Sequence, residues 1–156
     1  MRATKRIAMF LACLQAAYPH VSHDWWPVRH AFRPPELEIA VGAALTQNTS
    51  WHNVERALEN MHEKHLTTAR GIARTNVRTL QSAIRPAGFF RQKTQCVKAL
   101  AAFLARKRFS NITRDELLAL SGIGPETADT ILLYALGERT FVIDAYTRRV
   151  FSRLGA

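Results

Sequence analysis

Cysteine is scarce in this chain of 156 residues, which contains only Cys13 and Cys96. The two are far apart and lie in no spacing typical of a metal site. The histidine pairs 20/23 and 62/65 have ligand-like spacing, but no further ligands accompany them. We therefore interpret them as surface histidines and predict that the chain binds no metal and no other cofactor.

Long apolar runs are also lacking. Residues 7–14 are apolar and follow three basic residues, a pattern that imitates a signal peptide. The run is short, Gln15 interrupts it, and it falls well below the roughly 18 apolar residues of a membrane span. We interpret this segment as the first helix of a cytoplasmic protein, associated with the nucleoid in a bacterial-type cell.

Acidic residues are few, with 12 Asp plus Glu against 22 Lys plus Arg and a net charge of +10. None lies between Glu63 and Asp115, whereas that stretch is rich in basic residues. These are Lys64, Arg70, Arg74, Arg78, Arg85, Arg91, Lys93, Lys98, Arg106, Lys107, Arg108 and Arg114. A solvated face would explain such a stretch, but a polyanion is the more natural partner because it balances the charge.

What the chain does contain is helical periodicity, with no persistent alternating strand pattern and no internal repeat. We predict an all-α fold. Expected helices cover residues 35–45, 51–64, a third capped by Thr75 and ending at residue 84, and 90–106. The last should direct Val97, Leu100, Phe103 and Leu104 inward.

Residues 117–149 are the most informative segment. Thr113 and Glu116 form a T-x-x-E capping box before an apolar run. Gly122 and Gly124 permit the positive φ angles of a sharp reversal, and Pro125 suits the first position of a following helix. The expected helical hairpin exposes backbone N–H groups at a helix N-terminus, where a phosphate can bind. The alternative is a hairpin without a ligand.

The second helix of this hairpin should end near Gly137. Asp144 follows a short loop and reads as the N-cap of a basic helix. Capping alone would explain this aspartate, and a catalytic role is the alternative.

These motifs, L-x-G-I-G-x-x-T-A-x-x-I-L followed by V-I-D-A-Y-T-x-R, resemble the helix-hairpin-helix DNA glycosylases of the endonuclease III superfamily. The resemblance implies that the hairpin grips DNA phosphates and that Asp144 acts at the sugar of the damaged nucleotide. The hairpin residues concerned are Gly122, Ile123, Gly124 and Thr127. Many relatives carry a four-cysteine iron–sulfur cluster, which this chain cannot form from its own cysteines.

Two further segments, L-T-Q-N-T and I-R-P-A-G-F-F-x-Q-K, also resemble this superfamily. The resemblance implies that Gln47 probes the space left by an extruded base; a loop-capping amide is the alternative. Relatives that also cut the DNA backbone have a lysine where this chain has Glu126. A carboxylate offers no amine nucleophile, so we expect a monofunctional glycosylase.

The W-W-P segment resembles the 3-methyladenine branch of the superfamily. The resemblance implies a base pocket with Trp25, Trp26 and Pro27 on one wall and Trp51 opposite; core packing is the alternative. Alkylated purines carry positive charge, which an indole face attracts by about 0.5–2 kcal/mol. We therefore expect an alkylated purine as substrate.

The family layout implies a barrel-like lobe over residues 28–137, containing the hairpin at 114–136, and a partial second lobe from 1–27 and 138–156. Relatives continue for several tens of residues, so we expect a truncated C-terminus. Apolar surface should then be exposed around Phe10, Leu11 and Leu14 and beneath Val150 and Phe151.

Three hypotheses follow. The first is a DNA glycosylase that releases alkylated purines from damaged double-stranded DNA, acting as a monomer. The second is an endonuclease III-like glycosylase for oxidised pyrimidines or mispaired adenine. The third is an inactive DNA-binding fragment of such an enzyme.

Overall fold

The computed structural model describes residues 3–20, 26 and 31–155. The chain divides into two compact units. The larger unit is Val28–Phe141, and the smaller unit combines Met1–Pro27 with Val142–Ala156.

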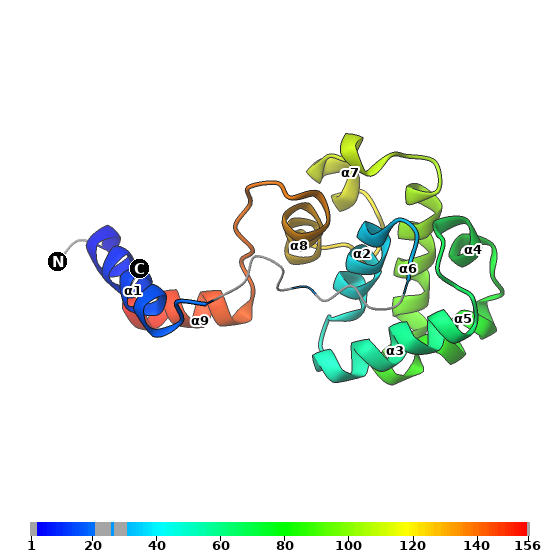
Figure 1. Ribbon diagram of the computed structural model, residues 1–156, viewed down its shortest axis with the longest axis horizontal. Helices are drawn as coiled ribbons and strands as arrows, with labels where there is room; N and C mark the ends of the chain where they lie inside the picture. Colours follow the sequence, from blue (N-terminus) through cyan, green and yellow to red (C-terminus); the bar gives the residue numbers. More distant parts are fainter. Residues whose placement is uncertain (1–2, 21–25, 27–30, 156) are drawn as a thin grey trace. The chain divides into compact units, whose positions relative to one another are not determined.

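The larger unit is built from helices (Figure 1). They are α2 (Pro35–Leu45), α3 (Trp51–Glu63), α4 (Ala69–Arg74), α5 (Val77–Ile84), α6 (Phe90–Leu104), α7 (Arg114–Leu118) and α8 (Pro125–Leu136), with short 3-10 turns η1 (Arg85–Ala87) and η2 (Phe109–Asn111). Within the described ranges, the one β feature is an isolated bridge between Arg33 and Thr68. The predicted all-α fold is confirmed.

Helix α2 forms the centre of the larger unit. Every residue from Leu37 to Leu45 is buried, because the helix is apolar around nearly its whole circumference. It packs against α3, α6 and α8, and in Figure 1 it lies between α8 and α6. This position matters for the site, because Leu45 ends α2 two residues before Gln47.

The region between α3 and α6 differs from the sequence prediction. Thr75 does not cap the helix that ends at Ile84; it ends α4, and the Asn76 carboxamide caps α5 by accepting from the Arg78 N–H at 2.8 Å. Helix α4 was not predicted because six residues are too few to establish a helical period. Thr68 caps it by accepting from the Gly71 N–H.

Helix α6 ends at Leu104, two residues earlier than predicted. Val97, Leu100 and Leu104 are buried as expected. Phe103 is only half-buried, and the Lys107 ammonium lies 5.8 Å from the centre of its ring. The inward orientation predicted for Phe103 is therefore only partly correct.

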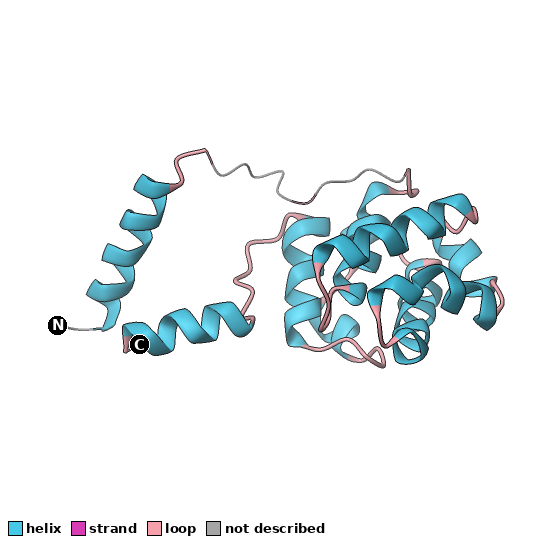
Figure 2. Cartoon of the chain, turned by 90° about the horizontal axis from the view of Figure 1, so that it is seen from below, coloured by secondary structure: helices cyan, strands magenta, loops and turns pink. Residues whose placement is uncertain are grey.

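The smaller unit contains α1 (Ala3–Ala17) and α9 (Ala145–Leu154), and the start of α1 lies near the end of α9 (Figure 2). The Arg6 guanidinium donates to the Leu154 carbonyl at the end of α9 at 3.1 Å. Leu11 and Leu14 are exposed, whereas Phe10 is half-buried. None of the helices described is long and apolar enough to span a membrane.

Candidate functional site

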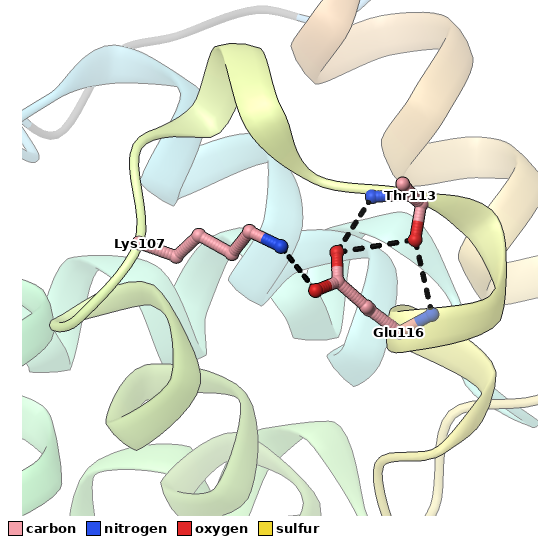
Figure 3. A network of polar contacts seen from close by, with 3 residues as sticks. All are labelled: Lys107, Thr113 and Glu116. Atoms are coloured by element: carbon pink, nitrogen blue, oxygen red, sulfur yellow. Dashed lines mark hydrogen bonds and ion pairs between the residues drawn. The ribbon is translucent and has the colours of Figure 1, made fainter.

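The first helix of the predicted hairpin, α7, is fixed at its N-terminus by a polar network (Figure 3). The predicted capping box is present: the Thr113 N–H donates to Glu116 Oε2 at 3.0 Å, and the Glu116 N–H donates to Thr113 Oγ1 at 3.4 Å. Lys107 forms an ion pair with Glu116 Oε1. The hydrogen bond from Lys107 is the main cause of the lowered pKa of Glu116. The network ties the start of the hairpin to the segment that follows α6.

A second ion pair holds the two hairpin helices together. Arg114 on α7 donates through Nε to Asp129 Oδ1 at 2.7 Å and through Nη2 to Asp129 Oδ2 at 3.1 Å. This two-pronged geometry fixes orientation as well as distance. The hydrogen bond to Asp129 raises the pKa of Arg114.

The turn between α7 and α8 depends on one left-handed residue. Gly122 has φ +84°, and a Cβ at this position would lie 2.8 Å from the Cβ of Cys96. The positive φ predicted for Gly124 is wrong: its φ is −94°, and a Cβ there would meet nothing within 4 Å. One left-handed residue is enough to reverse the chain, so Gly124 serves instead as the extended N-cap of α8.

The N-terminus of α8 is the place where the sequence predicts a phosphate-binding site. Pro125 occupies its first turn, and Gly124 contributes no side-chain cap. The first N–H groups of a helix have no acceptor within it, and the helix dipole makes this end positive. Ile123 and Thr127 are buried beneath the turn, while Glu126 is exposed on the first turn.

Gln47 joins the loop after α2 to this hairpin. Its Nε2 donates to the Gly122 carbonyl at 3.1 Å and to Thr127 Oγ1 at 3.1 Å. Gln47, predicted from a separate segment, therefore meets two of the predicted hairpin residues in one place. The side chain of Gln47 remains exposed, so solvent or a ligand can reach it.

A cavity of about 250 Å³ opens beside Gln47. It is lined by Ala44, Gln47, Asn48, Phe89, Gln92, Lys93, Cys96 and Gly122. Phe89 is 62% exposed and has a left-handed backbone with φ +43°. Most of this aromatic ring therefore faces solvent beside the cavity. The sequence prediction missed Phe89, although its position after Pro86-Ala87-Gly88 gave a signal.

Lys93 also lines this cavity and is only 6% exposed. Its Nζ donates to the Leu45 carbonyl at 2.8 Å and to the Ala87 carbonyl at 2.7 Å. Burial lowers its pKa. The sequence prediction counted Lys93 only as part of the basic stretch.

Asp144 belongs to the smaller unit and caps α9, as predicted. Its Oδ1 accepts from the Thr147 N–H at 2.7 Å, and the Thr147 hydroxyl donates to the Val142 carbonyl at 3.3 Å. The first of these bonds orients the carboxylate and uses only one of its oxygens. The remaining oxygen is available to a substrate or a water molecule.

The predicted aromatic pocket is only partly within the described residues. Trp25 and Pro27 lie outside them. Trp26 is 9% exposed, and Trp51 is the half-buried first residue of α3. Trp51 does not belong to the lining of the cavity beside Gln47.

Comparison with known proteins identifies the family. Residues 41–156 match the HhH-GPD superfamily of base excision DNA repair proteins. The chain belongs to this superfamily. It is 43% identical over 144 residues to the Methanocaldococcus jannaschii protein named "Putative DNA repair glycosylase MJ1434", covering 85% of this chain and 63% of that protein. It is 26% identical to endonuclease III of Thermotoga maritima, covering 83% of this chain and 61% of that protein. The chain thus spans less than two thirds of either relative.

Two solved structures have the same fold. The H. pylori 3-methyladenine DNA glycosylase (MagIII) bound to 1,N6-ethenoadenine has a TM-score of 0.83 at 28% identity, covering 95% of this chain and 73% of that one. A non-covalent endonuclease III–DNA complex has a TM-score of 0.80 at 24% identity, covering 99% and 70%. The predicted family is therefore confirmed.

Among the described residues, no cluster of three or more His, Cys, Asp or Glu side chains is placed to hold a metal ion. Cys13 is exposed and Cys96 is buried, each as a free thiol. Burial raises the pKa of Cys96 to about 11, so its thiol is protonated at neutral pH and is a poor metal ligand.

Proposed function

We propose that this chain binds damaged double-stranded DNA and hydrolyses the N-glycosidic bond of an alkylated purine. The observation that carries the proposal is the assembly of Gln47, Gly122 and Thr127 at the N-terminus of α8. It combines a helix end suited to a phosphate with an exposed amide beside it. Membership of a base excision DNA repair superfamily supports DNA as the partner.

Phosphate binding would hold the duplex, and two side chains beside the cavity would open it. Gln47 and Phe89 are both exposed there, one a hydrogen-bonding amide and the other a flat apolar ring. Inserted apolar wedges unstack neighbouring bases, and a polar amide can then satisfy the exposed base edges. We infer that the pair replaces the extruded nucleotide in the stack, which is the step that exposes the glycosidic bond.

Asp144 would then promote hydrolysis. A purine alkylated at N3 or N7 is already cationic, so it leaves with the electron pair of the glycosidic bond without prior protonation. The carboxylate stabilises the oxocarbenium-like sugar and accepts a proton from the water that attacks C1′. The Thr147 N–H holds this carboxylate in a fixed orientation, which favours both roles.

The reaction should stop at base removal. Glu126, which takes the place of the lysine of bifunctional relatives, has no nucleophilic nitrogen. The Lys93 amine lies in the cavity, but it is buried and bonded to two carbonyls. Neither residue offers a free amine for a Schiff base, which supports a monofunctional enzyme.

An alkylated purine is favoured by the tryptophans and by similarity to a protein named as a 3-methyladenine DNA glycosylase. An indole ring attracts a cationic base more strongly than a neutral one. The second candidate is an endonuclease III-like activity on oxidised pyrimidines or mispaired adenine. Similarity to T. maritima endonuclease III favours it.

Base release from a panel of duplexes tests the proposal. Methylated, oxidised and A·G-mismatched duplexes are incubated in parallel with the wild-type chain and with Asp144→Asn. We expect release from methylated DNA alone, and none by the variant. Release only from oxidised or mismatched DNA would support the second candidate. If the chain binds DNA but releases no base from any of these substrates, the third hypothesis, an inactive DNA-binding fragment, is supported.

Affinity for an undamaged duplex, measured against salt concentration, tests the DNA interface separately. Each phosphate contact contributes about 0.9 to the slope of log affinity against log salt. Four basic residues of the segment between Glu63 and Asp115 already bind other protein groups, so we do not count them among the phosphate contacts. They are Lys93, Lys98, Lys107 and Arg114. A slope near zero would exclude the proposed phosphate contacts.

A further inference from the structure

Lys93 joins two segments that the proposed function places against DNA. Its ammonium bridges the Leu45 carbonyl at the end of α2 and the Ala87 carbonyl at the end of η1. Each carbonyl lies two residues before an exposed side chain of the cavity, Gln47 in one case and Phe89 in the other. A single side chain thus spans the bases of both loops.

Both loops leave their helices through left-handed backbone conformations. Asn48 has φ +52°, and Gly88 and Phe89 have φ +69° and +43°. Asparagine enters this region readily, whereas phenylalanine does so only when surrounding contacts hold it there. The two bonds of Lys93 fix the backbone at the point where each loop begins.

A lysine is uncommon at a buried position unless it is paired. Removing an ammonium from water is costly, and two carbonyl acceptors return only part of its hydration. An apolar side chain of similar length would avoid that cost, but it would leave the Leu45 and Ala87 carbonyls without this donor. Burial lowers the pKa of Lys93, in keeping with an unfavourable site for its charge.

We propose that Lys93 is a positioning residue that fixes the spacing between Gln47 and Phe89, so that both side chains enter the DNA stack together. The inference rests on the proposed function, because insertion has meaning only if the chain binds duplex DNA. Lys93 itself does not touch the DNA and takes no part in the chemistry.

The chain provides a matched control on the same helix. Lys98 also donates from Nζ to two backbone carbonyls, those of Ala73 at 2.9 Å and Thr75 at 2.6 Å. These carbonyls belong to the end of α4, and Lys98 does not line the cavity. Replacing Lys98 by Met removes the same kind of bonds without altering the two loops.

The experiment uses a duplex that carries 2-aminopurine opposite a tetrahydrofuran abasic-site analogue. Insertion of side chains around the 2-aminopurine changes its fluorescence. If Lys93 only stabilised the fold, a folded variant would still produce this change. In Lys93→Met we expect this fluorescence change to fall by about fivefold or more, because Gln47 and Phe89 no longer keep the spacing that joint insertion requires. Affinity for undamaged duplex should stay within about twofold, because phosphate contacts are retained. Lys98→Met should match the wild type in both measurements.

Lys93→Gln serves if the Met variant does not fold. Its shorter amide can reach at most one of the two carbonyls, so the same loss of fluorescence change is expected. A folded Lys93 variant with the wild-type fluorescence change would overturn the proposal, and so would failure of both variants to fold. If the wild type itself produces no change and does not bind duplex DNA, the proposed function fails as well.

Discussion

Gln47 and Thr127 share a hydrogen bond of 3.1 Å although 80 positions separate them in the sequence. The same amide group binds the Gly122 carbonyl, so it contacts both sides of the hairpin turn. The loop after α2 therefore holds the hairpin turn at the proposed phosphate-binding site, in addition to any contact that the loop makes with a base. Thr127 is buried and the amide is exposed, which places the bond at the edge of the core.

Gln47→Ala should loosen the hairpin turn. Each lost hydrogen bond contributes about 0.5–1.5 kcal/mol, and solvent can replace part of that at an exposed site. We expect faster hydrogen exchange at residues 122–127 and a lower affinity for duplex DNA. Gln92→Ala is the control, because Gln92 also lines the cavity but makes no hydrogen bond to the hairpin. Equal exchange rates in the two variants would contradict the supporting role of Gln47.

Gly122→Ala should destabilise the chain, whereas Gly124→Ala should not. A residue with a Cβ at position 122 would adopt φ +84° and collide with Cys96, at a cost of roughly 1–3 kcal/mol. Position 124 has φ −94° and open space around its Cβ, so alanine should leave the free energy of unfolding nearly unchanged. Urea denaturation measures both.

Asp144→Asn should separate capping from catalysis. Asparagine caps a helix about as well as aspartate, so the melting temperature should hardly change. Base release should fall by about 10²–10⁴-fold, since the amide neither accepts a proton nor stabilises positive charge. A folded variant with undiminished release would show that Asp144 is only a cap.

Borohydride should trap no covalent complex between the wild-type chain and abasic or damaged DNA. Trapping requires an imine between an amine and the sugar, and Glu126 provides no amine. A lysine-containing relative that also cuts the backbone serves as the positive control. A trapped adduct mapped to a lysine would refute the monofunctional assignment.

Acid should weaken the start of the hairpin through Glu116. Its pKa in the folded chain lies below the ordinary value of 4.5, mainly because of the Lys107 hydrogen bond. Its contribution to stability is therefore complete above pH 4.5 and is lost as the pH falls through the folded pKa. The difference in unfolding free energy between wild type and Glu116→Gln should shrink from pH 6 toward pH 3. A constant difference would show that the Glu116 charge is unimportant.

The hairpin could be predicted from the sequence because its signals are local. Capping box, proline, glycine and Asp144 each act within a few residues of their own position. The errors at Thr75 and Gly124 arose where two adjacent or nearby residues could fill one structural role, and backbone geometry decided between them.

The connections within the site could not be predicted in this way. Gln47 reaches Gly122 across 75 positions, and Lys93 reaches Leu45 across 48. No local pattern encodes such pairs, because they depend on how α2, α6 and α8 pack. The family resemblance suggested a role for Gln47 but indicated no hydrogen-bonding partner for it. Only the fold reveals that Lys93 differs from its basic neighbours.

The two lysines of α6 have partners that every amino acid provides. Lys93 and Lys98 both bind main-chain carbonyls, so their acceptors persist whatever side chains occupy positions 45, 87, 73 and 75. Those four positions can vary through mutation without breaking the bonds, provided the local backbone is kept. The lysines have no such freedom. In each of these bonds the lysine should therefore tolerate substitution poorly, while the residue that provides the carbonyl should tolerate it well. Deep mutational scanning of the chain would measure this difference directly.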